Sequence, residues 1–173
     1  MSQEKIQEIL TTLKKRHEEN RLNYYEPYKF QKNFHEAGAD ANQRLLMAAN
    51  RVGKSYVGAM EMSIHLTGLY PKWWTGKKFA KPIRAWVCGA SNETTRDICQ
   101  RELFGQPDNP RDKGRGSIPK HLIGETTRKP GVPNAHSSVL VQHLSGGWSR
   151  VAFKAYEMGA EKFMGESIDL VWL

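Results

Sequence analysis

The sequence predicts one α/β domain with a largely parallel central sheet, helices on both faces and an inserted β-hairpin. Three observations support this fold class. Short apolar runs typical of buried strands alternate along the chain with segments of helical period. Two segments of alternating polarity flank a Ser-Gly-Gly turn, which is the pattern of a hairpin. A chain of 173 residues that is 39% hydrophobic and 10% aromatic can bury a core without disulfides or a metal.

The first 23 residues are expected to form a helical extension. Apolar residues at helical spacing among charged ones predict a helix over residues 2–20, and these are Ile6, Ile9, Leu10 and Leu13. The domain itself is expected to span residues 24–173. It begins with an aromatic segment, residues 24–35, and a helix from 29 to 37 that ends before Gly38.

The remaining elements follow from apolar runs, caps and turn residues. Ser91 or Asn92 caps a helix, and Ser145-Gly146-Gly147 forms the hairpin turn. Loops rich in glycine and proline separate the elements. We expect strands at 44–49, 83–90, 138–144, 150–156 and 168–173, helices at 56–65 and 92–104, and loops at 68–82 and 105–136.

The charge of the chain favours a polyanionic partner. It has 26 Lys and Arg residues against 18 Asp and Glu, for a formal net charge of +8. Several of these cations lie in the 105–136 segment, where they are candidates for contacts to DNA phosphates: Arg111, Lys113, Arg115, Arg128 and Lys129. A solvated mobile loop is the alternative. No run of about 18 apolar residues is present, which argues against a membrane span.

The strongest local signal is Ala48-Ala49-Asn50-Arg51-Val52-Gly53-Lys54-Ser55. It matches the phosphate-binding loop G-x-x-x-x-G-K-[ST] except for Ala48 in place of the first glycine. In such a loop the backbone N–H groups surround the phosphates, and the glycine allows close approach. Lys54 would place its charge near the β- and γ-phosphates, and Ser55 would offer its hydroxyl to Mg²⁺. An ordinary strand-to-helix turn is the alternative.

Further residues are expected to contact ATP. Arg51 is a candidate catalytic cation for the γ-phosphate, beside Lys54, or else a solvent-facing arginine. Gln31, 22 residues before Gly53, is a candidate for pairing with the adenine edge, with an aromatic residue stacked on the base. The ATP-binding set is Ala48, Ala49, Asn50, Arg51, Val52, Gly53, Lys54, Ser55, Tyr56, Gln31 and Tyr28.

Three blocks of the sequence resemble the large subunit of tailed-bacteriophage terminases. They are the segment Tyr-Glu-Pro-Tyr-Lys-Phe-Gln-Lys-Asn-Phe-His at 25–35, the phosphate-loop block at 46–55, and Phe-Lys-Ala-Tyr-Glu-Met-Gly-Ala-Glu-Lys-Phe-Met-Gly at 153–165, which leads into 168–173. The resemblance implies a P-loop NTPase of the additional-strand class. It also implies an ATP- and Mg²⁺-dependent motor that moves double-stranded DNA into a procapsid.

The resemblance also implies partners and a location. These are the terminase small subunit, the portal protein and further copies in a homo-oligomeric ring, with no membrane, in the host bacterial cytoplasm and transiently at the procapsid portal. The family's acidic Asp-Glu pair would follow the strand 168–173, but the sequence ends at Leu173. Asp169 and Glu166 precede the strand end and do not replace it. We therefore expect this partial ATPase domain, without the nuclease domain, to bind ATP but to hydrolyse it poorly.

Other functions remain compatible with these residues. One is a helicase-like or other P-loop nucleic-acid ATPase. Another is a non-catalytic module that binds nucleotide or DNA, and a third is a basic nucleic-acid binder in which Gly-Lys-Ser is accidental. The six histidines show no metal-ligand spacing.

Overall fold

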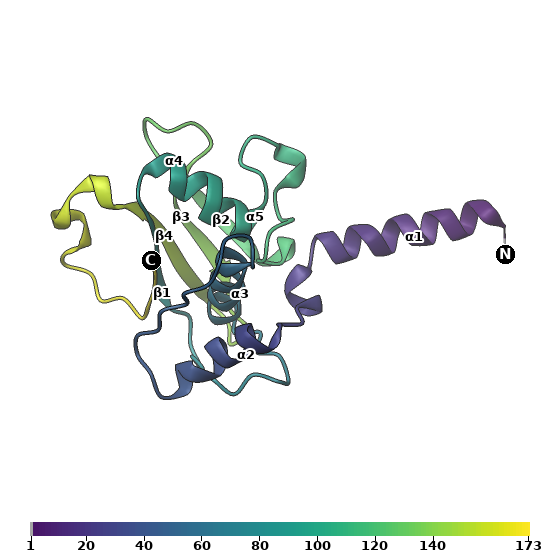
Figure 1. Cartoon of the computed structure of the whole chain (residues 1–173). Helices are drawn as coiled ribbons and strands as arrows, with labels where there is room; N and C mark the ends of the chain where they lie inside the picture. The colour runs from purple at the N-terminus through teal and green to yellow at the C-terminus, as the bar shows by residue number, and fades with distance from the viewer. Residues whose placement is uncertain (1) are drawn as a thin grey trace.

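The computed structural model describes residues 2–173 as a five-stranded sheet with helices packed on one face (Figure 1). The strand order is β2-β3-β4-β1-β5. The strands are β1 (Arg84–Gly89), β2 (Ile123–Arg128), β3 (His136–Gln142), β4 (Trp148–Ala155) and β5 (Leu170–Trp172). The strands predicted at 83–90, 138–144, 150–156 and 168–173 are therefore all present.

The sheet is mixed, and the prediction of a largely parallel sheet is wrong. β1 pairs in parallel with β4 and β5, whereas β2–β3 and β3–β4 are antiparallel. The sheet is mixed because the β3–β4 hairpin belongs to it. β4 pairs in parallel with β1, and on its other side β3 and then β2 add antiparallel pairs. β2 lies in the 105–136 segment, which its proline, glycine and basic residues predicted to be loop. Its pairing with β3 makes it a strand.

The main core lies between one face of the sheet and two helical segments. The first is α3 (Lys54–Thr67), and the second is a continuous helix built from α4 (Asn92–Thr94), the π-helical turn η3 (Thr95–Gln100) and α5 (Arg101–Phe104). Ser91 caps α4 by accepting the N–H of Thr94 at 3.1 Å, as predicted. The buried residues that join these helices to the sheet include Met62, Leu66, Ala85, Val87, Leu103, Val139, Val151 and Phe153.

The opposite face of the sheet has a different cover. Trp86, Cys88 and Ala152 form a small cluster there, packed by Phe163 and Ile168. That cover contains the 3₁₀ turns η6 (Tyr156–Met158) and η7 (Ala160–Phe163). The predicted helices on both faces are therefore wrong for residues 2–173, in which no α-helix packs on this side.

Residues 44–49 do not form the predicted strand. Leu45 and Met47 are each 82% exposed, although the apolar run predicted a buried segment. A strand needs a hydrogen-bonding neighbour, and in residues 2–173 the sheet ends at β5, which pairs with β1 alone. The outer edge of β5 is therefore open among residues 2–173, and the run does not pair with it.

The N-terminal part consists of α1 (Gln3–Glu18), η1 (Arg21–Tyr24), α2 (Lys29–Glu36) and η2 (Ala37–Ala39). α1 has no buried residue and projects from the body of the molecule (Figure 1). Short 3₁₀ turns η4 (Pro110–Asp112) and η5 (Lys120–Leu122) lie in the segment before β2. Within the described range, none of the helices has the length and apolar character needed to cross a membrane.

Candidate nucleotide site

The loop before α3 has the backbone geometry of an anion-binding turn. Gly53, the N-cap of α3, has φ 87° and ψ 25°, a left-handed conformation that glycine adopts without strain. Arg51 also has a positive φ of 63°, which is uncommon for a residue with a side chain. Backbone held in this region is found at ligand-binding turns, where successive N–H groups converge. The loop thus holds two residues in the left-handed region, Arg51 and Gly53.

Lys54 closes this loop with its side chain. Its ammonium donates to the carbonyl oxygens of Ala48 at 2.8 Å and Ala49 at 2.7 Å. An ammonium has three N–H donors, so one is left for an anion. The first helical residue thus positions a cation over the start of its own loop.

Gln31 lies beside the loop, although 22 residues separate it from Gly53. It is 3% exposed, and its Oε1 accepts the backbone N–H of Tyr28 at 2.9 Å, which caps α2. A Cβ added at Gly53 would lie 3.3 Å from Gln31 Nε2. The amide predicted to contact adenine and the glycine predicted to approach phosphate are therefore neighbours. Tyr28 is 72% exposed, with Phe30 stacked parallel at 6.4 Å.

Other members of the predicted set lie around the loop in different environments. Ala48, Ala49, Asn50 and Arg51 are exposed, and Val52 and Ser55 are half-buried. Tyr56 packs edge-on against Tyr25 at 5.7 Å and joins an aromatic cluster with Leu22, Met60, Ile64 and Trp74. Burial raises the pKa of Tyr56. Its ring thus packs in this cluster, on the side of α3 away from the sheet.

A buried carboxylate network behind the loop was missed from the sequence. Glu61, 5% exposed on α3, is bound by Arg44 and by His35 Nδ1 at 2.8 Å. His65 Nε2 lies 3.5 Å from the same carboxylate. Burial by itself would raise the pKa of Glu61. Hydrogen bonds from His35, His65 and Arg44 outweigh that effect and lower the pKa to about 2. A lone glutamate in the apolar run 57–66 was the signal that a cationic partner would be found.

The network ties the loop's surroundings together. Arg44 also donates to the carbonyl of Phe34 at 2.9 Å, and His35 Nε2 lies 3.0 Å from the Tyr25 hydroxyl. α2, the segment entering the loop and α3 are thereby joined at one buried charge. Because Gln31 lies on α2 and Gly53 caps α3, this network sets their separation.

The basic residues of the 105–136 segment do not form one patch. Arg115 is paired with Glu18 at 3.3 Å and approaches Asp112 at 3.7 Å. Lys129 donates to the carbonyl of Phe153 at 3.4 Å, and burial lowers its pKa. Arg111 is exposed. Lys113 and Arg128 line a cavity, and Lys129 is also part of its wall.

Two acidic residues near β5 have structural partners. Asp169 accepts the backbone N–H of Arg84 at 2.8 Å, and Glu166 accepts the indole N–H of Trp86 at 3.2 Å. Across residues 2–173 no three His, Cys, Asp or Glu side chains are grouped to hold a metal.

Comparison with known proteins identifies the family. Residues 45–173 match the family model described as terminase large subunit, T4likevirus-type, N-terminal. The chain is 37% identical to the terminase large subunit of Salmonella phage P22 over an alignment of 194 positions. That alignment covers 99% of this chain and 38% of the phage protein, so the chain spans well under half of its relative's length. No solved structure matches it. Because it matches this family model and is 37% identical to the phage P22 protein, the chain, with its phosphate-loop motif, belongs to the terminase large subunit family.

Proposed function

We propose that this chain is the ATP-binding part of a DNA-packaging terminase. The observation that carries the proposal is the left-handed Gly53 turn with the Lys54 ammonium drawn over it and the Gln31 amide beside it. Family membership supports the same assignment. The fold would then be a P-loop NTPase. In the intact protein, ATP hydrolysis would drive double-stranded DNA into the procapsid.

Each residue has a proposed role in binding. The loop's backbone N–H groups and Lys54 hold the β- and γ-phosphates, and Ser55 contributes one oxygen to Mg²⁺, which neutralises phosphate charge. Gln31 pairs with the adenine edge, and the exposed Tyr28 is placed to cover the base. Arg51, exposed and at positive φ, is the candidate cation for charge that develops on the γ-phosphate.

The assembly partners are part of the proposal. The terminase small subunit, the portal protein and copies of this chain in a ring would surround the motor, in the cytoplasm of the host bacterium and at the procapsid portal. Contacts of the chain with DNA are expected through phosphate groups, since a motor that moves along DNA needs binding that ignores sequence.

Calorimetric titration with Mg-ATP tests the site. Lys54→Ala removes the only side-chain cation that spans the loop in residues 2–173, and we expect it to weaken binding at least tenfold. Lys72→Ala, an exposed lysine in the 68–82 loop, is the matched control and should bind as the unsubstituted chain does. Equal affinity for all three proteins would contradict a phosphate role for Lys54.

A further inference from the structure

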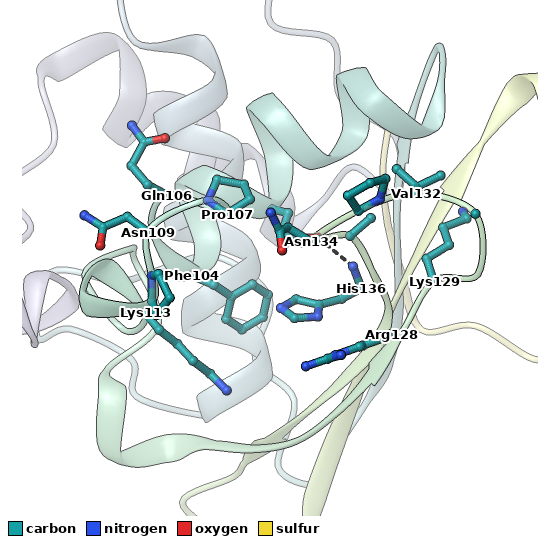
Figure 2. Close-up of a pocket in the computed structure, with 16 residues that line it drawn as sticks. Phe104, Gln106, Pro107, Asn109, Lys113, Arg128, Lys129, Val132, Asn134 and His136 are labelled. Atoms are coloured by element: carbon teal, nitrogen blue, oxygen red, sulfur yellow. Dashed lines mark hydrogen bonds between the residues drawn. The ribbon is translucent and has the colours of Figure 1, made fainter.

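A cavity lies toward the β2–β3 edge of the sheet, away from the phosphate loop. It has a volume of about 630 Å³ and opens between the end of the α4–η3–α5 helix, the loop after it, and the ends of β2 and β3 (Figure 2). The phosphate loop is on the β5 side, because Gly58 of α3 packs on Trp172. β3 is three strands from β5, roughly 14 Å at the usual strand spacing. The two sites are therefore distinct.

The lining of this cavity is cationic. Arg128 and His136 are cross-strand partners in the β2–β3 ladder, so both side chains emerge on one face of the sheet. Lys113 approaches from the facing loop, and Figure 2 shows the ends of Lys113 and Arg128 directed toward the space beside the His136 ring. Among the described residues that line the cavity none is Asp or Glu. An anion is the ligand that this charge arrangement suits.

Hydrogen bonds hold the walls of the cavity in place. Gln100, from the π-helical turn, donates to the carbonyl of Asn134 at 2.8 Å and accepts the N–H of His136 at 2.8 Å. Arg96 donates to the carbonyl of Pro133 at 3.0 Å. Asn134 has φ 59°, a left-handed conformation that these contacts maintain. The cavity is thus shaped before any ligand enters, and π-turns of this kind are frequent at functional sites.

The His136 ring, which lines the cavity, lies near two cations and has an unpaired nitrogen among the described residues. Its Nδ1 is buried and has no hydrogen-bond partner among residues 2–173, and its ring packs edge-on against Phe104 at 6.1 Å. Burial first, and then the charges of Lys113 and Arg128, lower its pKa. An anion between the two cations would offset their effect and favour the imidazolium. Occupancy of the cavity can therefore be followed at this histidine.

We propose that this cavity binds a phosphate group between Lys113 and Arg128, and that a phosphodiester of the DNA backbone supplies it. Side-chain amides and backbone groups on the rim add hydrogen-bonding capacity without base-specific geometry, which fits a backbone contact. The inference is independent of ATP binding at the phosphate loop. Free phosphate is the other source of the same chemistry, and the experiment separates the two.

The experiment uses the full chain carrying Lys54→Ala, so that the phosphate loop contributes nothing. The His136 pKa is measured by NMR alone, with inorganic phosphate, and with a blunt DNA duplex of about 16 base pairs. We expect the duplex to raise this pKa, because a bound phosphate would offset the charges of Lys113 and Arg128. A rise with phosphate alone and none with the duplex would assign the cavity to a free phosphate and overturn the DNA source. No rise with either would overturn the proposal.

DNA affinity gives an independent readout. Fluorescence anisotropy with the same duplex compares Lys113→Gln/Arg128→Gln with the control Lys72→Gln/Lys81→Gln, which removes two exposed lysines elsewhere. The cavity variant should bind about tenfold more weakly, with a salt slope lower by about 0.9, the value for one lost phosphate contact. The control should lose less than threefold. If both variants lose DNA affinity equally, and thermal melts show that both are folded, only net charge matters. That result would overturn the proposal that the cavity binds DNA phosphate.

Discussion

Glu61 joins three segments of the chain through one buried carboxylate. Arg44 and His35 bind its two oxygens, and His65 lies within ion-pair distance one helical turn away. A buried charge of this kind is expensive to leave unpaired, so its partners are held where they are. The residue has no contact with the phosphate loop, yet it fixes the helices that carry Gln31 and Gly53. It is a positioning residue for the proposed site.

Glu61→Gln should destabilise the fold by about 3 kcal/mol at pH 7, because the substitution leaves Arg44 buried without its charge partner. The folded pKa of Glu61 is about 2, below its ordinary value of 4.5. The ionised carboxylate therefore contributes stability above pH 4.5, and this contribution is lost as the pH falls toward 2. Urea unfolding at pH 7 and pH 3 measures the difference between the two proteins.

The control for that substitution is Glu125→Gln, an exposed glutamate on β2. It should change the free energy of unfolding by less than about 0.5 kcal/mol at both pH values. The expected pattern is a gap between Glu61→Gln and the unsubstituted chain that narrows at pH 3. A gap of the same size at both values would show that the carboxylate charge has no part in the stability.

At the scale of elements, α3 is the piece on which the rest is assembled. One side packs on β1, β3 and β4, and another packs on the aromatic cluster around Trp74. Its contact with β5 is close because Gly58 has no side chain. A Cβ at Gly58 would lie 2.5 Å from Trp172 Cε2. The glycine therefore lowers the helix propensity of α3 but allows α3 and β5 to approach closely.

Gly58→Ala tests this packing, because the sign of the change in unfolding free energy depends on the contact with Trp172. In an open helix the change would stabilise by up to about 1 kcal/mol, but here the methyl group meets the Trp172 ring. We expect a loss of about 1–2 kcal/mol in urea unfolding. In a Trp172→Val background the ring is absent, so the same substitution should be neutral or stabilising. Additive effects in the two backgrounds would contradict the contact.

At the scale of the whole molecule, the sheet and the apolar run 44–49 are separated. The described sheet ends at β5, and the run lies outside it with Leu45 and Met47 exposed. The phosphate loop follows this run directly. The binding loop is thus held on one side by α3, and on the other side residues 45–49 separate it from the Arg44 contact with Glu61.

Hydrogen exchange should show this division. Amides of residues 44–52 should exchange within about tenfold of the unstructured rate, because they join no ladder, whereas those of β1 and β4 should be the most protected. Mg-ATP should slow exchange at 50–55 under the proposed function. Protection of 44–49 equal to that of β1 in the free chain would show that a strand forms there after all.

Local features of this protein could be predicted because neighbouring residues determine them. Ser91 caps its helix whatever the sheet does, Gly146-Gly147 turns the hairpin, and Gly53 and Lys54 begin a helix directly after a loop. The helices and four of the five strands follow from periodicity in the same way. The terminase resemblance also came from contiguous blocks, and the family comparisons confirm it.

Only the tertiary structure decided how distant segments combine. Polar β2 becomes a strand because it pairs with β3, whereas the apolar 44–49 run stays outside the sheet although β5 has one neighbour only among the described residues. The partners of Glu61 and the cavity between Lys113 and Arg128 come from residues far apart in the chain. A strand needs a neighbouring strand and a buried charge needs a partner of opposite charge. The sequence pattern does not show which distant residues will be those partners.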